Sequence, residues 1–158
     1  MSETSSVIDV LGLYILLAGF IIGLGAVTVI DTLGFLGRKS SYWTEATTRT
    51  HKVTKPLIWL GMTLATAGGV ITFRDDGFTS YTWLQLIIVA ALVANGVFLS
   101  FRVSPFLLNR ENSGKSGELL PEAWQQKITV SFIISFFGWW TELLLVVLKL
   151  VHANPPLT

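Results

Sequence analysis

The chain has 158 residues, of which 51% are hydrophobic and only 13% are charged, and its formal net charge is +1. Soluble domains carry about 25% charged residues, so this composition argues against a soluble domain, and the balanced charge gives no reason to expect nucleic-acid binding. The chain has no cysteine, which excludes disulfides, thiolate metal sites and thiol redox chemistry.

The apolar residues fall into four long blocks, and each block predicts a membrane-spanning segment. The blocks cover about residues 7–36, 56–73, 82–104 and 124–151. Backbone groups in lipid must be satisfied within the segment, so all four are expected to be helices. The sequence therefore predicts an all-α integral membrane protein whose residues 1–158 form one domain, a bundle of four transmembrane helices.

The first block carries Gly19 and Gly23 at the spacing that lets two helix backbones approach closely. We expect this pair to pack the bundle internally rather than to form an oligomer interface. Asp31, near the end of the block, should lie at about the same depth as Lys55. An Asp31–Lys55 ion pair with a structural role is therefore expected, since both side chains can reach the membrane interface.

Residues 41–55 are polar but compatible with a helix, and they predict a juxtamembrane helix that is either separate from the second block or continuous with it. Pro56 fits the first turn of the following helix. His51 lies among basic residues, which favour its neutral form, and it is either an interfacial residue or a ligand. His152 follows the fourth block on the other side of the membrane, so a haem held by both histidines of one chain is excluded.

The third block ends near Pro105, where we expect the helix to stop or to kink.

Small residues also recur along the second block, at Gly61, Ala65 and Gly69, and predict close packing there. Asp75 to Gly77 form a turn signal between the second and third blocks.

Glu142 is an acidic residue inside the apolar fourth block, on one helix face with Ser131 and Ser135. A charge at mid-bilayer costs at least ~2.5–3.5 kcal/mol, so such a residue faces protein or water, is paired, or stays neutral. Thr66 and Asn95 are expected at a similar depth. Glu142, Asn95, Ser135 and Thr66 are thus candidates for a ligand- or proton-binding cluster; alternatively Glu142 is a neutral acid that fixes the packing of the bundle.

The basic residues predict the orientation of the chain. Two loops, 37–55 and 105–123, lie on the same side if there are four spans. Nine basic residues fall on that side: Arg38, Lys39, Arg49, Lys52, Lys55, Arg102, Arg110, Lys115 and Lys127. The other side has only Arg74 and Lys149. The positive-inside rule then places these loops in the cytoplasm and both termini outside, and the short loops favour a prokaryotic cytoplasmic membrane.

Two stretches, THKVTKPLIWLGMTLATAGGVIT (Thr50–Thr72) and NGVFLSFRVSP (Asn95–Pro105), resemble the CopD-like and HemJ-like group of small four-helix membrane proteins. The resemblance implies a helix bundle, and in some members a link to haem, porphyrin or copper through a histidine in the first span. The first span here has no histidine, and no Met/His/Cys cluster is present. The architecture is therefore the part that carries over, with His51 as the one residue able to take a ligand role.

No nucleotide, hydrolase, zinc-protease or calcium motif is visible, so we expect no metal site and favour a protein that is not an enzyme. The leading hypothesis is an ion-, proton- or small-ligand-binding, transport or assembly module. The alternative is a membrane oxidoreductase-type protein linked to haem, porphyrin or quinone near His51. A structural subunit is a third hypothesis. The lipid bilayer is the expected partner, and a homo-oligomer or a partner membrane subunit remains open.

Overall fold

The computed structural model describes residues 3–153, and these residues are helical with no strand among them. The helices are α1 (Glu3–Gly37), α2 (Ser41–Thr72), α3 (Ser80–Phe98), the short π-helix η1 (Leu99–Val103), α4 (Ser104–Asn112) and α5 (Glu122–Ala153). The all-α prediction is confirmed for this part of the chain.

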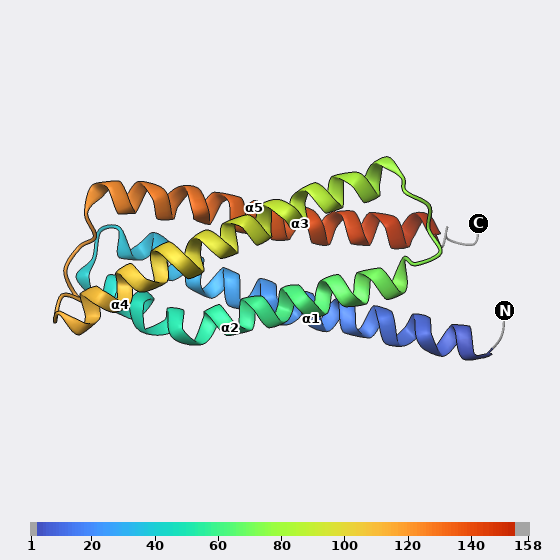
Figure 1. The fold of residues 1–158 in the computed structure, drawn as a ribbon, viewed down its shortest axis with the longest axis horizontal. Coiled ribbons are helices and arrows are strands. Elements are labelled where there is room, and N and C mark those ends of the chain that lie inside the picture. Colours follow the sequence, from blue (N-terminus) through green and yellow to red (C-terminus); the bar gives the residue numbers. More distant parts are fainter. Residues whose placement is uncertain (1–2, 154–158) are drawn as a thin grey trace.

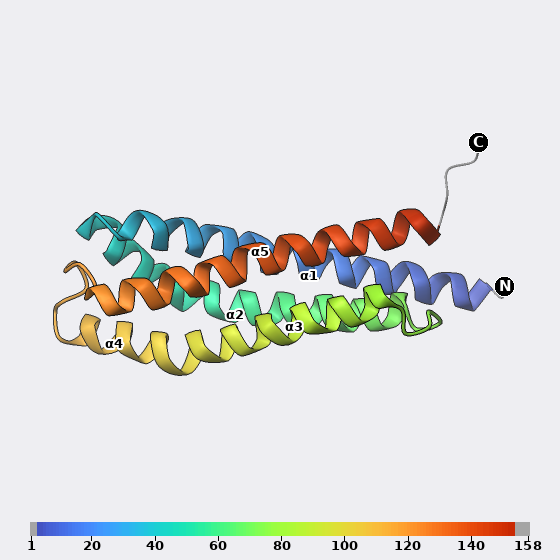
Figure 2. The same cartoon turned by 90° about the horizontal axis from the view of Figure 1, so that it is seen from above.

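The helices form four long rods, because α3, η1 and α4 follow one another without a break (Figure 1). α1 and α2 run antiparallel as one pair, and the α3–α4 rod runs antiparallel to α5 as another (Figure 2). The described chain begins and ends at one end of the bundle, together with loop 73–79; we call this the terminal end. The other end, with turn 38–40 and loop 113–121, is called the basic end.

α1 and α2 are in contact along most of their length, because small residues let the two backbones touch. A Cβ atom added to Gly61 would overlap the backbone of Gly23, and one added to Gly19 would overlap the backbone of Ala65. Gly68 meets the backbone of Leu16 in the same way. The expected close packing of Gly19, Gly23, Gly61 and Ala65 is confirmed for this helix pair, whereas Gly68 rather than the expected Gly69 makes the third contact.

Three helical segments are long and apolar enough to cross a membrane: Val7–Gly37, Ser80–Asn112 and Glu122–Val151. α2 is not among them, because its first half, residues 41–55, is polar. Large apolar side chains on the outside of the bundle are exposed, among them Ile21 at 75% and Phe101 at 74%. An apolar exterior is what a bilayer requires, whereas in water it would be a liability. The chain is therefore a membrane protein.

Two prolines occupy positions that differ from the expectation. Pro56 lies inside α2 rather than in its first turn, so residues 41–55 are continuous with the second predicted span. Pro105 does not end the third helix at residue 104. The missing N–H of Pro105 leaves the carbonyl of Phe101 without an α-helical partner. The backbone widens into η1 here, and the N–H of Ser104 donates to the carbonyl of Leu99. The rod then continues as α4 to Asn112.

Candidate functional site

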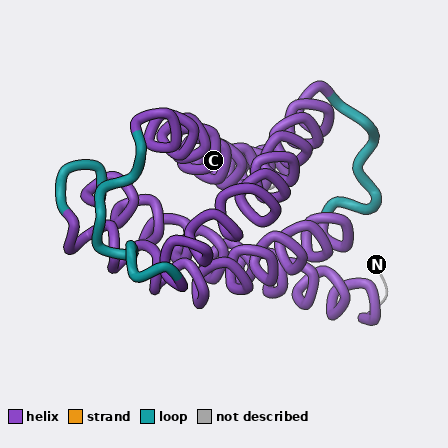
Figure 3. Tube along the Cα trace, turned by 60° about the vertical axis from the view of Figure 1, so that its left-hand side comes forward, coloured by secondary structure: helices purple, strands orange, loops and turns teal. Residues whose placement is uncertain are grey.

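A cavity lies between the two helix pairs near the terminal end, and we call it the Glu142 cavity. Its volume is about 370 Å³, and its lining comes from α1, α2, α3, α5 and loop 73–79. Figure 3 shows the helices of the bundle and, in teal, the loops that connect them. The lining is mainly apolar, with Phe20, Leu92 and Trp139 among its buried members.

Glu142 is the buried acidic side chain of this lining, and it is only 9% exposed. Gln85 of α3 lines the same cavity, on the helix that faces α5. The second oxygen, Oε2, is buried and has no hydrogen-bond partner. Thr66 lines the same cavity, as expected, but its hydroxyl makes no contact with Glu142 that would form a cluster. Glu142 thus has at least one carboxyl oxygen that no protein group satisfies.

The mouth of the Glu142 cavity is charged and tied together by ion pairs. Lys149 Nζ lies 2.9 Å from Asp76 Oδ2 and 4.1 Å from the centre of the Phe73 ring. Arg74 lies 2.7 Å from Asp9 Oδ1. These contacts link α5 and α1 to loop 73–79, so an apolar interior with one acid opens toward a polar rim.

Asn95 does not join Glu142, and the expected cluster of the two is therefore wrong. Asn95 Nδ2 donates to the carbonyl of Ser131 at 3.1 Å, and Ser131 Oγ donates back to Asn95 Oδ1 at 2.7 Å. The antiparallel register explains this: Glu142 lies three helical turns beyond Ser131, roughly 16 Å along α5, and faces Gln85 instead. Ser135 is buried on α5 but does not line the Glu142 cavity.

A smaller cavity of about 90 Å³ lies near the basic end, and we call it the His51 cavity. Asp31 of α1 and His51 of α2 both line it. The register brings them together, because Gly23 packs against Gly61 and Gly37 against Thr44, which places Asp31 opposite His51. The remaining lining comes from α1, α2, the α3–α4 rod and α5.

The expected Asp31–Lys55 ion pair is not formed. Lys55 lies one turn further along α2 than the residue opposite Asp31, and its Nζ reaches the carbonyl of Ser100 in η1 at 3.5 Å. Trp59 donates to Ser100 Oγ at 3.1 Å beside it. Asp31 Oδ2 is left buried without a hydrogen-bond partner. Lys55 therefore contacts η1 instead of Asp31, and Asp31 Oδ2 stays without a partner.

His51 also has an unpartnered atom, since its Nε2 is buried and accepts or donates no hydrogen bond. The residue belongs to the polar half of α2, outside the apolar block that begins at Pro56. Burial first, and the nearby Lys55 ammonium second, lower the pKa of His51 below its usual value. The imidazole is therefore neutral at pH 7, as expected from the basic residues around it.

Sequence reasoning named Asp31, His51 and Glu142 but did not find their neighbours. The facing of Asp31 and His51 follows from the tightness of turn 38–40, which fixes the α1–α2 register and which apolar periodicity does not reveal. Asp76 was interpreted only as part of a turn signal, and Lys149 only as one of two basic residues on the outer side. Their opposite charges at the same end of the bundle were the available signal for the pair.

Comparisons with family models, with curated proteins and with solved structures find no match to this chain. Among residues 3–153, moreover, no group of three or more His, Cys, Asp or Glu side chains is placed to hold a metal ion. The function must be argued from the two cavities and their unpartnered polar atoms.

Proposed function

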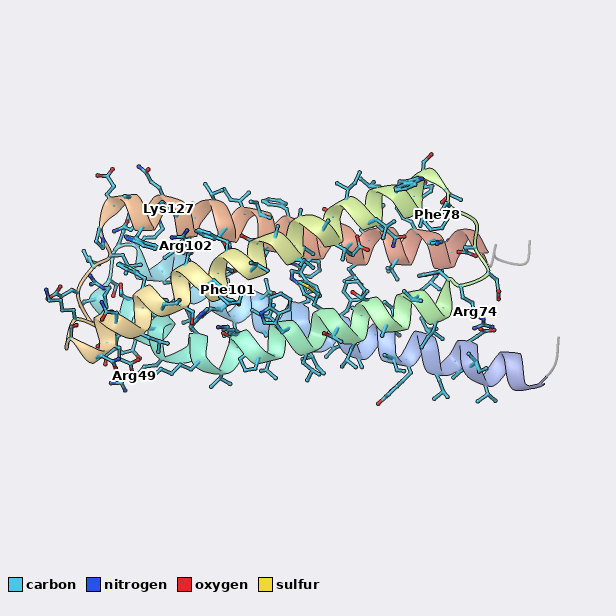
Figure 4. All side chains as sticks on the ribbon, viewed as in Figure 1. Arg49, Arg74, Phe78, Phe101, Arg102 and Lys127 are labelled. Carbon is cyan, nitrogen blue, oxygen red and sulfur yellow. The ribbon has the colours of Figure 1, made fainter. Side chains whose placement is uncertain are left out.

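We propose that all four rods cross a prokaryotic cytoplasmic membrane, with the basic end in the cytoplasm and both termini outside. On this proposal α2 crosses with its apolar half, from Pro56 onward, and its polar half stands at the inner surface. Arg49, Arg102 and Lys127 lie toward one end of the bundle and Arg74 toward the other, which supports this orientation (Figure 4).

We further propose that the protein is a binding module for a small amphipathic molecule, which it holds in the Glu142 cavity. The observation that carries the proposal is Glu142 Oε2, a buried oxygen without a partner on a mainly apolar cavity. A volume of about 370 Å³ falls within the ~300–1,000 Å³ typical of small-molecule sites, which combine an apolar lining with a few polar groups.

The chemistry of the lining defines the ligand. A hydrogen-bond donor on the ligand, such as a hydroxyl or amine, would satisfy Glu142 Oε2, because a buried acceptor without a partner is costly. The apolar body of the ligand would lie against Leu16, Leu92 and Trp139. A proton or a small ion bound at the same oxygen would use only the polar part of this site and would leave the apolar volume unexplained.

The test is to purify the full chain from its membrane, release bound molecules by denaturation and identify them by mass spectrometry. We expect the wild type to carry a bound amphipathic molecule that Glu142→Gln loses at least in large part. Gly69→Leu should lose it too, because a side chain at Gly69 enters the cavity and would meet only Leu16 Cδ1 at 3.8 Å.

Gly25→Leu is the matched control for this experiment, since Gly25 has no atom near its absent side chain and faces outward. It should retain the bound molecule. The absence of any bound molecule from the wild type, or equal amounts in all four proteins, would contradict the proposal.

The haem-, porphyrin- or quinone-linked alternative, and with it the resemblance to the CopD-like and HemJ-like group, depends on His51. The cavity there measures about 90 Å³, well below the ~300–1,000 Å³ of small-molecule pockets, and a porphyrin is a large ligand. This alternative therefore has less support than the Glu142 site.

A further inference from the structure

The His51 cavity presents several hydrogen-bond acceptors, and most of the protons on these groups are already used elsewhere. Gln125 Nε2, on α5, donates to the carbonyl of Leu120 at 2.8 Å. The threonine hydroxyls of the lining donate to backbone carbonyls at 2.7–3.0 Å, with the pairs Thr44 to Gly37, Thr47 to Trp43, Thr48 to Thr44 and Thr129 to Gln125. The threonine hydroxyls can therefore offer an occupant only oxygen lone pairs, and Gln125 can offer the lone pairs of its Oε1 beside the second N–H of Nε2.

Two further acceptors on the same cavity have no partner at all, Asp31 Oδ2 and His51 Nε2. A neutral imidazole with its proton on Nδ1 presents a lone pair at Nε2. A buried carboxylate without a counter-ion is strongly unfavourable, so Asp31 either stays neutral or is matched by a positive charge. An occupant that brings both a positive charge and several donors would satisfy all of these groups together.

We propose that the His51 cavity binds a small ammonium cation, ammonium itself or a short primary amine, between Asp31 Oδ2 and His51 Nε2. The N–H groups of such an ion supply one donor to each acceptor, and its charge balances Asp31. A cavity of about 90 Å³ has room for this ion and a few waters, since one water needs only ~10–15 Å³ on the same kind of measure. This site is separate from the Glu142 cavity and does not depend on the function proposed for it.

Other cations fit this lining less well. Sodium and magnesium prefer oxygen ligands, which would leave His51 Nε2 unused. A transition-metal ion would use the imidazole, but within residues 3–153 no third His, Cys, Asp or Glu accompanies Asp31 and His51. An ammonium ion needs hydrogen-bond acceptors rather than a metal coordination set, and acceptors are what the cavity offers.

Two basic side chains lie close to this site, Arg38 in the lining of the cavity and Lys55 beside His51, and neither forms an ion pair with Asp31. Lys55 Nζ is directed to the carbonyl of Ser100. Arg38 is exposed, and its guanidinium carbon lies 5.9 Å from the centre of the Phe35 ring. The charge of Asp31 is thus left for a diffusible ion.

The test follows the ¹⁵N resonances of the histidine rings in the detergent-purified full chain, at constant neutral pH. Ammonium chloride and methylammonium chloride are titrated against sodium chloride at equal ionic strength. We expect a saturable shift of His51 Nε2 with the two ammonium salts and none with sodium, while His152 serves as the internal reference. Asp31→Asn should weaken the response by at least about tenfold, because a charge-assisted hydrogen bond is lost.

Asp9→Asn is the matched control, since it removes a carboxylate of the same helix that pairs with Arg74 at the terminal end; it should leave the response unchanged. If the His51 Nε2 resonance of the wild type shows no saturable shift, the cavity holds only water and the proposal is overturned. A response in Asp31→Asn equal to that of the wild type would also overturn it. If Asp31→Asn does not fold, the comparison passes to thermal unfolding: ammonium should raise the melting temperature of the wild type but not of His51→Gln, and equal increases would also overturn the proposal.

Discussion

Asn95 and Ser131 form the most complete side-chain contact between the α3–α4 rod and α5. Each residue donates one hydrogen bond to the other, at 3.1 and 2.7 Å, and both are buried. In lipid, water is not available to replace either bond. The pair therefore fixes the register of the two helices, and this register in turn sets Gln85 opposite Glu142.

This pair is expected to contribute measurably to stability. In a double-mutant cycle of Asn95→Ala and Ser131→Ala, the coupling free energy should be about 0.6 kcal/mol and no more than about 1.7 kcal/mol, the average and the maximum for hydrogen bonds between membrane helices. The cycle reports on the bond from Ser131 Oγ, because Ser131→Ala keeps the backbone carbonyl that accepts from Asn95. Reversible unfolding in mixed micelles gives the free energies of the four proteins. A coupling energy of zero would mean that the two side chains do not hold the helices together.

Glu142 and Asp31 illustrate how much of the site a sequence can provide. An acid within an apolar block stands out from hydropathy alone, so Glu142 could be named in advance. The residue opposite it could not, because a polar residue near the same depth on another helix, such as Asn95, is as good a candidate as Gln85 until the register is known. The same one-turn uncertainty led to the expected but incorrect pairing of Asp31 with Lys55.

At the scale of the helices, the close α1–α2 contact is the most stringent feature of the fold. Gly61 faces the backbone of Gly23, and no flexible side chain lies between them that could move aside. Any side chain at Gly61 must push α1 and α2 apart, although the two helices remain in close contact on both sides of this position. The contact thus depends on the absence of a single methyl group.

Gly61→Ala should therefore destabilise the bundle by about 1–3 kcal/mol, the usual cost of overpacking a tight core. Gly25→Ala is the control, because nothing lies near its absent side chain, and it should be neutral or slightly stabilising since alanine favours a helix. Thermal unfolding in one detergent compares the two variants. Equal effects in both would show that α1 and α2 do not touch at Gly61.

The helices themselves could be predicted from the sequence, whereas two of their limits could not. Four apolar blocks in a chain that must satisfy its backbone in lipid leave little choice but helices. Prolines are less decisive signals: Pro56 lies on the exposed side of α2 and is tolerated inside it, and at Pro105 a π-helical turn absorbs the lost hydrogen bond. Neither accommodation is encoded in the local residue types.

At the scale of the whole molecule, the two cavities lie toward opposite ends of one bundle. The Glu142 cavity opens near Arg74 and Lys149 at the terminal end, and the His51 cavity lies at the basic end. The orientation of the chain in the membrane therefore decides which cavity meets the outside and which meets the cytoplasm.

The absence of cysteine from the chain makes this orientation directly measurable with single-cysteine variants. Ser41→Cys reports on turn 38–40, Gly77→Cys on loop 73–79 and Ser113→Cys on loop 113–121; all three positions are exposed. With four spans and outer termini, a membrane-impermeant maleimide should label Gly77→Cys in intact cells, and the other two only after permeabilisation. If α2 does not cross the membrane, Ser41→Cys and Gly77→Cys must behave alike, because no span separates them. Labelling of Ser41→Cys and Ser113→Cys but not Gly77→Cys would instead reverse the orientation, and would place the Glu142 cavity on the cytoplasmic side.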